Sequence, residues 1–376
     1  MTRTVLVAGG GTAGHVFPAI AVAKELARQA DVNPVFVGVP DRLEARLVPE
    51  AGFRMHEIAA VSVPRRPSPA LFKVPFAVRA AVRECERIAR EEQAAAVATF
   101  GGYVSFPLDR AAKRLGLPLV IHEQNAVPGL TNRIAARWAD RVAVTFPGSA
   151  DRFPHPERCA VTGDPVREDL LHLDRDAQRA DAREAFGLDP VVPTLLVFGG
   201  SQGARSLNRA VTEAHGRWGV DSLQILHAAG RGLHDEAVAA WESARAARPG
   251  IRVEVLDFID DMARAYAAAD VVVCRAGATS IAELTVLGLP AVLVPYPHAT
   301  GDHQTANARA LEQTGGAVVV EDAELDGAAL VAAAEPLLTD PDRGGRMAAA
   351  SRAFGRPDAA ANVARLVLEQ LDRAAR

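Results

Sequence analysis

The sequence predicts an α/β fold with two domains, each built on a parallel sheet covered by helices. Short apolar runs of strand length alternate with longer helical segments along the chain, which is the pattern of such sheets. A single hydrophobic core rarely extends over as many as 376 residues. An apolar strand followed by a glycine-rich loop and a helix begins near residue 4 and again near residue 194. Two Rossmann-like domains facing each other across a cleft are therefore expected.

The composition is that of a globular protein and excludes several classes. Apolar residues make up 49% and charged residues 23%, which excludes a disordered chain. The formal net charge of −4 gives no overall attraction to nucleic acid. No run reaches the roughly 18 uncharged apolar residues of a spanning helix, and a strand starts too early for a signal peptide. The three cysteines, with neither metal nor disulfide spacing, suit a reducing cytosol.

The strands are expected where apolar residues cluster. These runs are 4–8, 34–38, 55–59, 95–99, 118–122, 141–145 and 158–162 in the first half, and 194–198, 223–227, 252–256, 271–274, 291–294 and 317–320 in the second. The charged run 174–184 is expected to be a solvated helix, and 325–351 two alanine-rich helices. An amphipathic helix over 359–375 is expected to return to the first domain.

The first glycine loop, residues 9–15, lies between a strand and a helix predicted from Pro18 to Ala30. This arrangement cradles phosphate, because the first N–H groups of a helix lack partners. Gly9, Gly11 and Gly14 match G-x-G-x-x-G. Dinucleotide binding is nevertheless disfavoured, since the next strand ends without the acid that would hold an adenosine ribose.

Further polar loops are expected at the same edge of the first sheet. They follow the strands ending at Thr99 and His122, and ligands of parallel sheets bind at the carboxyl ends of the strands. Their polar residues are Tyr103, His122, Glu123 and Asn125. Each of these residues could instead serve only to satisfy buried backbone groups.

A basic and apolar stretch between residues 63 and 87 allows two interpretations. One is a loop followed by a solvated helix face. The other is an interfacial patch, in which aromatic and aliphatic side chains enter lipid while cations meet phosphates. The residues of this patch are Arg65, Arg66, Leu71, Phe72, Lys73, Phe76 and Arg79.

The second half offers a nucleotide diphosphate site. Backbone N–H groups near Ser201 and Gly203 form one part of it. A helix predicted to open at Thr279 and Ser280, with these hydroxyls at its cap, forms the other. Glu283, about one turn into that helix, is placed to accept hydrogen bonds from a ribose hydroxyl pair. The alternative is that Glu283 only stabilises its own helix end, by about 0.3–1 kcal/mol.

These features together favour a nucleotide-sugar transferase. The leaving nucleoside diphosphate gains charge in the transition state, and preorganised N–H donors stabilise it. The acceptor hydroxyl must lose a proton, and His15 is the candidate base because histidine accepts protons near neutral pH. Alternatively, His15 hydrogen-bonds to phosphate or to the loop backbone. The acids at 260–261 are interpreted as a helix cap, and no histidine has zinc-ligand spacing with a cysteine, so no metal is expected.

Six motifs together resemble the MurG family of bacterial N-acetylglucosaminyltransferases, which convert lipid I into lipid II. The motifs are 10–18 (GGTAGHVFP), 101–107 (GGYVSFP), 122–125 (HEQN), 199–205 (GGSQGAR), 274–283 (CRAGATSIAE) and 302–304 (DHQ). The resemblance covers essentially the whole chain. It implies the GT-B fold, inversion of the sugar configuration without a catalytic metal or other cofactor, and a peripheral location on the cytoplasmic face of the inner membrane.

The resemblance also implies partners and domain roles. The substrates are UDP-N-acetylglucosamine and lipid I, the membrane partner is an anionic surface, and other cell-wall synthesis proteins are left open. No nucleic acid is implied. Residues 1–164 and 357–376 correspond to the acceptor and membrane domain, and residues 165–356 to the UDP-N-acetylglucosamine domain.

Site residues are implied motif by motif. First-domain contacts to the donor are Thr12, Ala13, Gly14, Asn125 and Arg167. Acceptor handling falls to His15 and Tyr103. In the second domain, Ser201 corresponds to a phosphate contact, Ile259 to a backbone contact with uracil, and Gln304 to a donor-sugar contact. The diphosphate and ribose grip corresponds to Ala278, Thr279, Ser280, Ile281, Ala282 and Glu283.

Three positions depart from the family pattern. Ala13 stands where the first loop usually has glycine, which narrows backbone freedom. Asp164 replaces a common asparagine and places a negative charge near a pyrophosphate site unless Arg167 pairs with it. Ala276 replaces the usual serine before Gly277. These changes affect no proposed catalytic group.

Two other functions are weighed against the transferase. One is a different GT-B enzyme, such as a UDP-sugar epimerase or a glycolipid galactosyltransferase. The other is a catalytically silent nucleotide-sugar-binding scaffold. The motifs at 101–107 and 122–125 favour the transferase.

Overall fold

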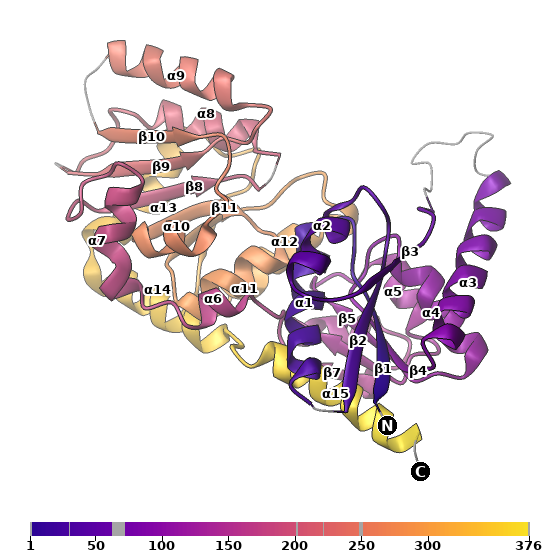
Figure 1. The fold of residues 1–376 in the computed structure, drawn as a ribbon. Helices are drawn as coiled ribbons and strands as arrows, with labels where there is room; N and C mark the ends of the chain where they lie inside the picture. The colour runs from indigo at the N-terminus through magenta and orange to yellow at the C-terminus, as the bar shows by residue number, and fades with distance from the viewer. Residues whose placement is uncertain are drawn as a thin grey trace. The chain divides into compact units, whose positions relative to one another are not determined.

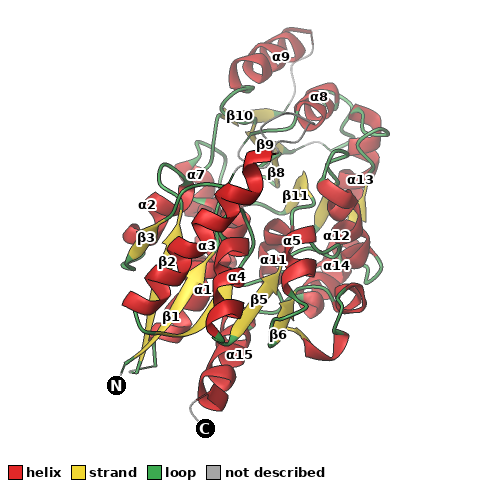
Figure 2. Ribbon diagram, turned by 90° about the vertical axis from the view of Figure 1, so that its right-hand side faces the viewer, coloured by secondary structure: helices red, strands yellow, loops and turns green. Residues whose placement is uncertain are grey.

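The computed structural model describes residues 2–29, 31–61, 72–200, 202–220, 222–247 and 251–374. They form two compact units (Figure 1). Unit 1 comprises Met1–Arg167 and Arg356–Arg376, and unit 2 comprises Glu168–Gly355. Each contains one parallel sheet, whose strands lie among helices (Figure 2). The predicted fold class, α/β with two Rossmann-like domains, is confirmed.

Unit 1 has a parallel sheet of seven strands within the described residues, in the order β3-β2-β1-β4-β5-β6-β7. Its strands are β1 (Arg3–Ala8), β2 (Val32–Gly38), β3 (Met55–Glu57), β4 (Ala94–Thr99), β5 (Leu119–Glu123), β6 (Arg141–Val144) and β7 (Cys159–Val161). Every run predicted as a strand is present, with ends that differ by a few residues. The strand order reverses between β1 and β4, and such a switch point opens a binding crevice at the carboxyl ends.

Helices cover both faces of this sheet because its central strands are apolar on both sides. Leu6 of β1 belongs to one core cluster, whereas Val5 and Val7 belong to the other. The helices of unit 1 are α1 (Ala13–Ala27), α2 (Leu43–Glu50), α3 (Val74–Glu91), α4 (Ser105–Leu115), α5 (Leu130–Ala135), α15 (Ala359–Ala374) and the 3-10 turns Pro147–Arg152 and Pro156–Arg158. The last helix, α15, packs on α1 and contributes Val363 and Val367 to the second cluster.

Unit 2 has a six-stranded parallel sheet among its described residues, in the order β10-β9-β8-β11-β12-β13. The strands are β8 (Thr194–Phe198), β9 (Gln224–Ala228), β10 (Arg252–Leu256), β11 (Val271–Arg275), β12 (Ala291–Val294) and β13 (Val318–Val319). The order reverses between β8 and β11. The second glycine loop follows β8 and the helix carrying Glu283 follows β11, so both lie at the switch point.

The helices of unit 2 connect these strands. They are α6 (Glu168–Leu171), α7 (Arg175–Ala185), α8 (Arg205–Glu213), α9 (His234–Ala247), α10 (Met262–Ala268), α11 (Ala278–Leu287), α12 (His303–Glu312), α13 (Gly327–Thr339), α14 (Pro341–Phe354) and the 3-10 turn Thr300–Asp302. No helix in the described part of the chain is both long and apolar enough to cross a membrane.

Two helix starts differ from the prediction. Helix α1 begins at Ala13, so Pro18 lies inside it and not near its start. Helix α11 begins at Ala278 with extended Gly277 as its N-cap, without a side-chain capping bond or an acid in its first turn. The prediction that Thr279 and Ser280 cap this helix is therefore wrong. In α11 the helix starts directly after Gly277, so the two hydroxyl residues expected at the cap lie in the first turn.

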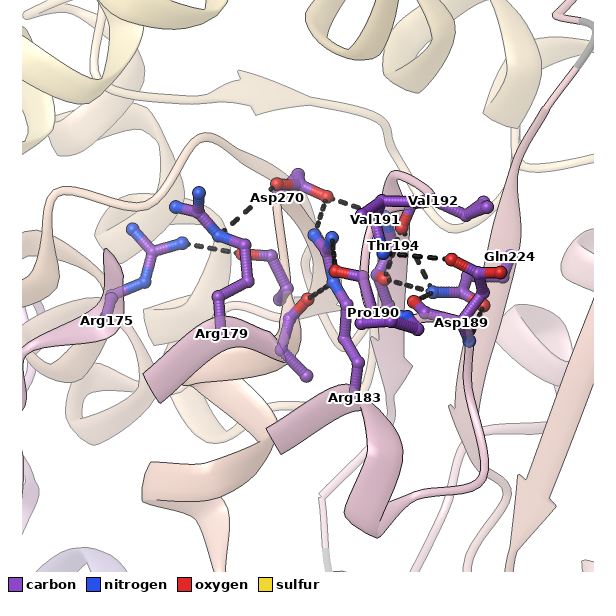
Figure 3. Close-up of polar contacts among 12 residues, drawn as sticks. Arg175, Arg179, Arg183, Asp189, Pro190, Val191, Val192, Thr194, Gln224 and Asp270 are labelled. Carbon is purple, nitrogen blue, oxygen red and sulfur yellow. Dashed lines mark hydrogen bonds and ion pairs between the residues drawn. The ribbon is translucent and has the colours of Figure 1, made fainter. Parts of the chain in front are cut away.

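The charged helix α7 was predicted to be solvated. Instead, some of its arginines bind the end of α10 (Figure 3). Arg183 is buried, and its Nε donates to the carbonyl of Ala268 at 3.0 Å while Nη2 contacts Asp270 at 2.6 Å. Arg175 donates to the carbonyls of Tyr266 and Ala269, and burial lowers its pKa to about 10. The last carbonyls of a helix lack partners within it. The arginines of α7 supply these partners for α10.

Replacing Arg183 with alanine is expected to destabilise unit 2 by about 3 kcal/mol, because buried carbonyls and the Asp270 carboxylate lose their donor. Arg179→Ala serves as the matched control on the same helix, since Arg179 is partly exposed and lies 3.9 Å from Asp270. It should cost less than about 1 kcal/mol. Calorimetric unfolding of the whole protein measures both variants. Equal losses would show that the buried arginine has no special part in holding α7.

Candidate functional site

The first glycine loop holds His15 against the loop that follows β4. Nδ1 of His15 lies 3.1 Å from the carbonyl oxygen of Gly10 and 3.0 Å from Oγ1 of Thr12. A carbonyl oxygen can only accept, so Nδ1 carries the proton and Nε2 is the basic nitrogen. A Cβ on Gly101 would lie 3.1 Å from Cδ2 and Nε2 of the imidazole. The imidazole of His15 therefore packs against Gly101, which has no side chain.

The loops after β1 and β4 touch through their backbones. Gly102 has φ +89, and a Cβ there would lie 2.2 Å from the carbonyl oxygen of Gly10. Only glycine permits this approach and this dihedral angle together. Tyr103 is 59% exposed, and a Cβ on Gly11 would lie 3.9 Å from its ring. The structure thus places the predicted pair, His15 in the first turn of α1 and Tyr103 after β4, beside two loops that are in contact.

Sequence reasoning missed Glu44 of α2, a buried carboxylate beneath the first glycine loop. Its Oε2 accepts from the amide of Gly11 at 3.0 Å, and its Oε1 from the amide of Val39 at 3.4 Å. A Cβ on Gly10 would lie 2.6 Å from Oε1. The Gly11 amide is therefore bound within the protein and does not join a phosphate cradle. The sequence around residue 44 carries no pattern that indicates this contact.

His122 and Glu123 have structural partners. His122 is buried, its Nε2 donates to the carbonyl of Gly163 at 2.9 Å, and burial lowers its pKa to about 4. Glu123 accepts from the amides of Asn125 and Gly129, at 2.9 and 3.0 Å, and burial raises its pKa. Both residues therefore hydrogen-bond to backbone groups of the protein, which was the alternative to a role in ligand binding. Asn125 lies half-buried on the loop that Glu123 folds.

The remaining first-unit positions lie around the start of α1 and the end of β7. Thr12 and Ala13 are exposed, and Gly14 is half-buried. The guanidinium of Arg167 lies 5.2 Å from the ring centre of Phe17. Asp164 is buried, with Oδ1 3.9 Å from Nδ1 of His122.

In unit 2, the loop after β8 rests on the loop after β9. Gly203 has φ +73, and a Cβ there would lie 2.1 Å from the carbonyl oxygen of Ala229. Asn208 of α8 donates to that same oxygen at 3.0 Å and lies 3.0 Å from Nε2 of buried His227. This chain of bonds fixes the glycine loop relative to its neighbour. Ser201, the predicted phosphate contact, lies outside the described residues.

Glu283 is held by a tyrosine. Oε2 of Glu283 accepts a hydrogen bond from the hydroxyl of Tyr266 at 2.8 Å, and Glu283 is only 8% exposed. Because Glu283 lies beyond the first turn of α11, the alternative that it stabilises its own helix end is wrong. The other residues of this segment, Ala278 to Ala282, form the first turn and a half of α11.

Three further predicted positions follow strands of the second sheet, two of them in loops and Gln304 in the first turn of α12. Ile259 is buried in the loop between β10 and α10, next to Asp261, which caps α10 by accepting from the amide of Arg264. This confirms the interpretation of Asp261 as a cap. Oε1 of Gln304 accepts from the amide of Tyr296 at 2.9 Å. Ala276 is buried, and its carbonyl accepts from Asn307 at 3.2 Å.

The predicted interfacial patch is described in part. Phe72 and Phe76 are 82% and 76% exposed, and Lys73 and Arg79 are exposed beside them. Arg65, Arg66 and Leu71 lie outside the described residues. No group of three or more histidine, cysteine, aspartate or glutamate side chains that could hold a metal occurs among the residues with described positions.

The comparisons with known proteins agree with this architecture. Residues 5–144 match the glycosyltransferase family 28 N-terminal domain, and residues 194–363 match the family 28 C-terminal domain. A crystal structure of Acinetobacter baumannii MurG aligns with a TM-score of 0.76 at 32% identity, over 98% of this chain and 99% of that one. The UDP complex of S. aureus MnaA aligns with a TM-score of 0.70 at 13% identity, over 99% of this chain and 97% of that one, which shows the fold alone.

Curated relatives identify the family more narrowly. A protein of Nocardioides sp. is 47% identical over 97% of both chains, and one of Acidothermus cellulolyticus is 47% identical over 96% of both. Both are named UDP-N-acetylglucosamine–N-acetylmuramyl-(pentapeptide) pyrophosphoryl-undecaprenol N-acetylglucosamine transferase. The fold and the family 28 domains define a GT-B glycosyltransferase. Within that class, the chain belongs to the MurG family.

The buried, neutral His122 predicts a pH dependence of stability in unit 1. An unfolded histidine takes up a proton near pH 6.5, whereas folded His122 does so only near pH 4. Its contribution is therefore fully present above pH 6.5 and is lost as the pH falls towards 4. His122→Gln keeps a donor for Gly163 but does not titrate.

The free energy of unfolding of His122→Gln should fall less steeply than that of the wild type between pH 6.5 and 4. The difference should amount to about 3 kcal/mol at most. Urea unfolding at a series of pH values measures it. Parallel curves for the two proteins would contradict a neutral, buried histidine at this position.

Proposed function

We propose that this protein transfers N-acetylglucosamine from UDP-N-acetylglucosamine to the C4 hydroxyl of the muramic acid of lipid I. The configuration of the sugar is inverted, and the product is lipid II for peptidoglycan synthesis. The observation that carries this proposal is the 47% identity, over 97% of both chains, to a curated enzyme whose name specifies this donor and this acceptor. The 32% identity to MurG of A. baumannii, over nearly the whole chain, supports it.

We assign the donor to unit 2. The N-terminus of α11 lies at the β8–β11 switch point and provides a positive dipole for the diphosphate. Ser201 and Ala278 to Ala282 then contact the diphosphate, Glu283 the ribose, Ile259 the uracil and Gln304 the sugar. Oε1 of Gln304 already accepts a hydrogen bond from the amide of Tyr296. This bond to the loop after β12 orients the Gln304 side chain.

Unit 1 then receives the acceptor and the membrane. Contacts from this unit to the donor are proposed for Thr12, Ala13, Gly14, Asn125 and Arg167. The exposed aromatic rings of Phe72 and Phe76, with Lys73 and Arg79 nearby, suit an anionic lipid surface. On this basis we place the protein peripherally on the cytoplasmic face of the bacterial plasma membrane.

The reaction is a single displacement. The C4 hydroxyl of the acceptor gives its proton to Nε2 of His15, and its oxygen forms a bond to C1 of N-acetylglucosamine. The bond between C1 and the diphosphate oxygen breaks, and UDP leaves with the electron pair. Preorganised amide donors stabilise the growing negative charge on the diphosphate. The bond from Nδ1 of His15 to Gly10 fixes the tautomer that leaves Nε2 basic, so loop binding and proton transfer are compatible roles.

Product analysis tests the proposal. Incubation of the full-length protein with UDP-N-acetylglucosamine and a lipid I analogue should yield UDP and a β-linked disaccharide on the lipid carrier, identified by mass spectrometry and NMR. Release of free N-acetylmannosamine would instead indicate an epimerase, and a glycosyl-diacylglycerol would indicate a glycolipid transferase. No turnover at all would favour the silent scaffold.

The seating of His15 on Gly101 predicts a loss of turnover in Gly101→Ala. The added methyl group meets the imidazole, so kcat should fall at least about tenfold, and His15→Ala should lower it by about 10²–10⁴-fold. Gly116→Ala is the matched control: it also has positive φ, but nothing lies within 4 Å of its Cβ. This control isolates the backbone strain. If both glycine variants lose the same activity, contact with His15 is not the cause.

A further inference from the structure

Tyr266 hydrogen-bonds to Glu283 of the proposed donor site without being one of the predicted contacts. It belongs to α10 and is fully buried. Its hydroxyl donates to Oε2 of Glu283 at 2.8 Å. Its ring packs edge-on against Phe198, with ring centres 6.2 Å apart. Because Phe198 is the last residue of β8, Tyr266 contacts both the strand that leads into the second glycine loop and the carboxylate on α11.

The backbone of Tyr266 is also held by a side-chain bond. Its carbonyl accepts from Nε of Arg175 at 3.1 Å, and the carbonyl of Ala268 accepts from Nε of Arg183 at 3.0 Å. At its other end, α10 is capped by Asp261. Both ends of this short helix are therefore held by side-chain bonds. A hydroxyl carried by such a helix has little freedom to move relative to its acceptor.

A fixed donor has a definite effect on a carboxylate. Glutamate has several rotatable bonds, and ordering its side chain costs entropy that ligand binding would otherwise have to overcome. The bond to Oε2 restricts rotation about the last of these bonds and thereby sets the direction of Oε1. An acceptor oriented before the ligand arrives binds a hydroxyl pair more tightly than a mobile one.

We propose that Tyr266 is a positioning residue whose hydroxyl orients the carboxylate of Glu283 to accept hydrogen bonds from the ribose of a uridine nucleotide. This inference rests on the proposed role of Glu283 in donor binding. It assigns no chemical step to Tyr266. It predicts instead that the tyrosine contributes to affinity only through the ribose hydroxyl groups.

The test removes one oxygen atom. Tyr266→Phe keeps the ring against Phe198 but cannot donate to Glu283. Isothermal titration of the full-length protein with UDP, and with 2′,3′-dideoxyuridine diphosphate, measures the preference for the ribose hydroxyl groups. In the variant, the ratio of the affinity for UDP to the affinity for the dideoxy analogue should fall about tenfold. Its KM for the donor should rise while kcat at saturating donor stays close to that of the wild type.

The matched control is Thr194→Val. It also removes a buried hydroxyl with a hydrogen bond in unit 2, but at the amino end of β8, where Thr194 accepts from Gln224 at 3.0 Å. This control should keep the ribose preference. If Tyr266→Phe weakens both nucleotides equally, the tyrosine only supports the fold and the inference is overturned.

Glu283→Gln separates failure of the inference from failure of the proposed site. If this variant keeps the full ribose preference, Glu283 does not bind the ribose and the proposed donor site is wrong. If it loses the preference while Tyr266→Phe keeps it, the site stands and the positioning role is wrong. If Tyr266 acts through Glu283, the double variant should bind no more weakly than Glu283→Gln alone.

Discussion

Close backbone contact between neighbouring loops is the constraint on which both candidate sites depend. In unit 1 the loop after β4 touches the loop after β1 at Gly102, and in unit 2 the loop after β8 touches the loop after β9 at Gly203. A side chain at either position would lie 2.1–2.2 Å from a carbonyl oxygen. The parallel sheets bring the strand ends together, but only residues without a Cβ allow the loops to share one surface.

Buried polar side chains then fix these loops in place. Glu44 binds the Gly11 amide, Glu123 folds the loop at Asn125, and Asn208 binds the carbonyl on which Gly203 rests. Burying such groups without partners would cost several kcal/mol each, so each also restricts where its partner can lie. The consequence for the proposed function is preorganisation, because the residues proposed to contact substrate lie on or next to loops that are already ordered.

The two units preorganise different functional groups, an imidazole in unit 1 and a carboxylate in unit 2. In unit 1 the Gly10 carbonyl sets the tautomer of His15, which is the condition for a basic Nε2. In unit 2 a tyrosine hydroxyl sets the direction of the Glu283 carboxylate, and arginines of α7 hold the helix that carries the tyrosine. Helix α7, which the charge pattern predicted to be solvated, thus contributes to the order of the proposed donor site.

The sequence by itself determined the two parallel sheets, the glycine loops and the family, because apolar periodicity and glycine spacing are local patterns that need no knowledge of distant contacts. Only the tertiary structure decided which polar residues serve the fold and which remain for a ligand. His122 meets Gly163, Gly11 meets Glu44 and Tyr266 meets Glu283 across 41, 33 and 17 positions. Such pairs depend on which strands become neighbours and on which faces become buried, and no local pattern encodes either.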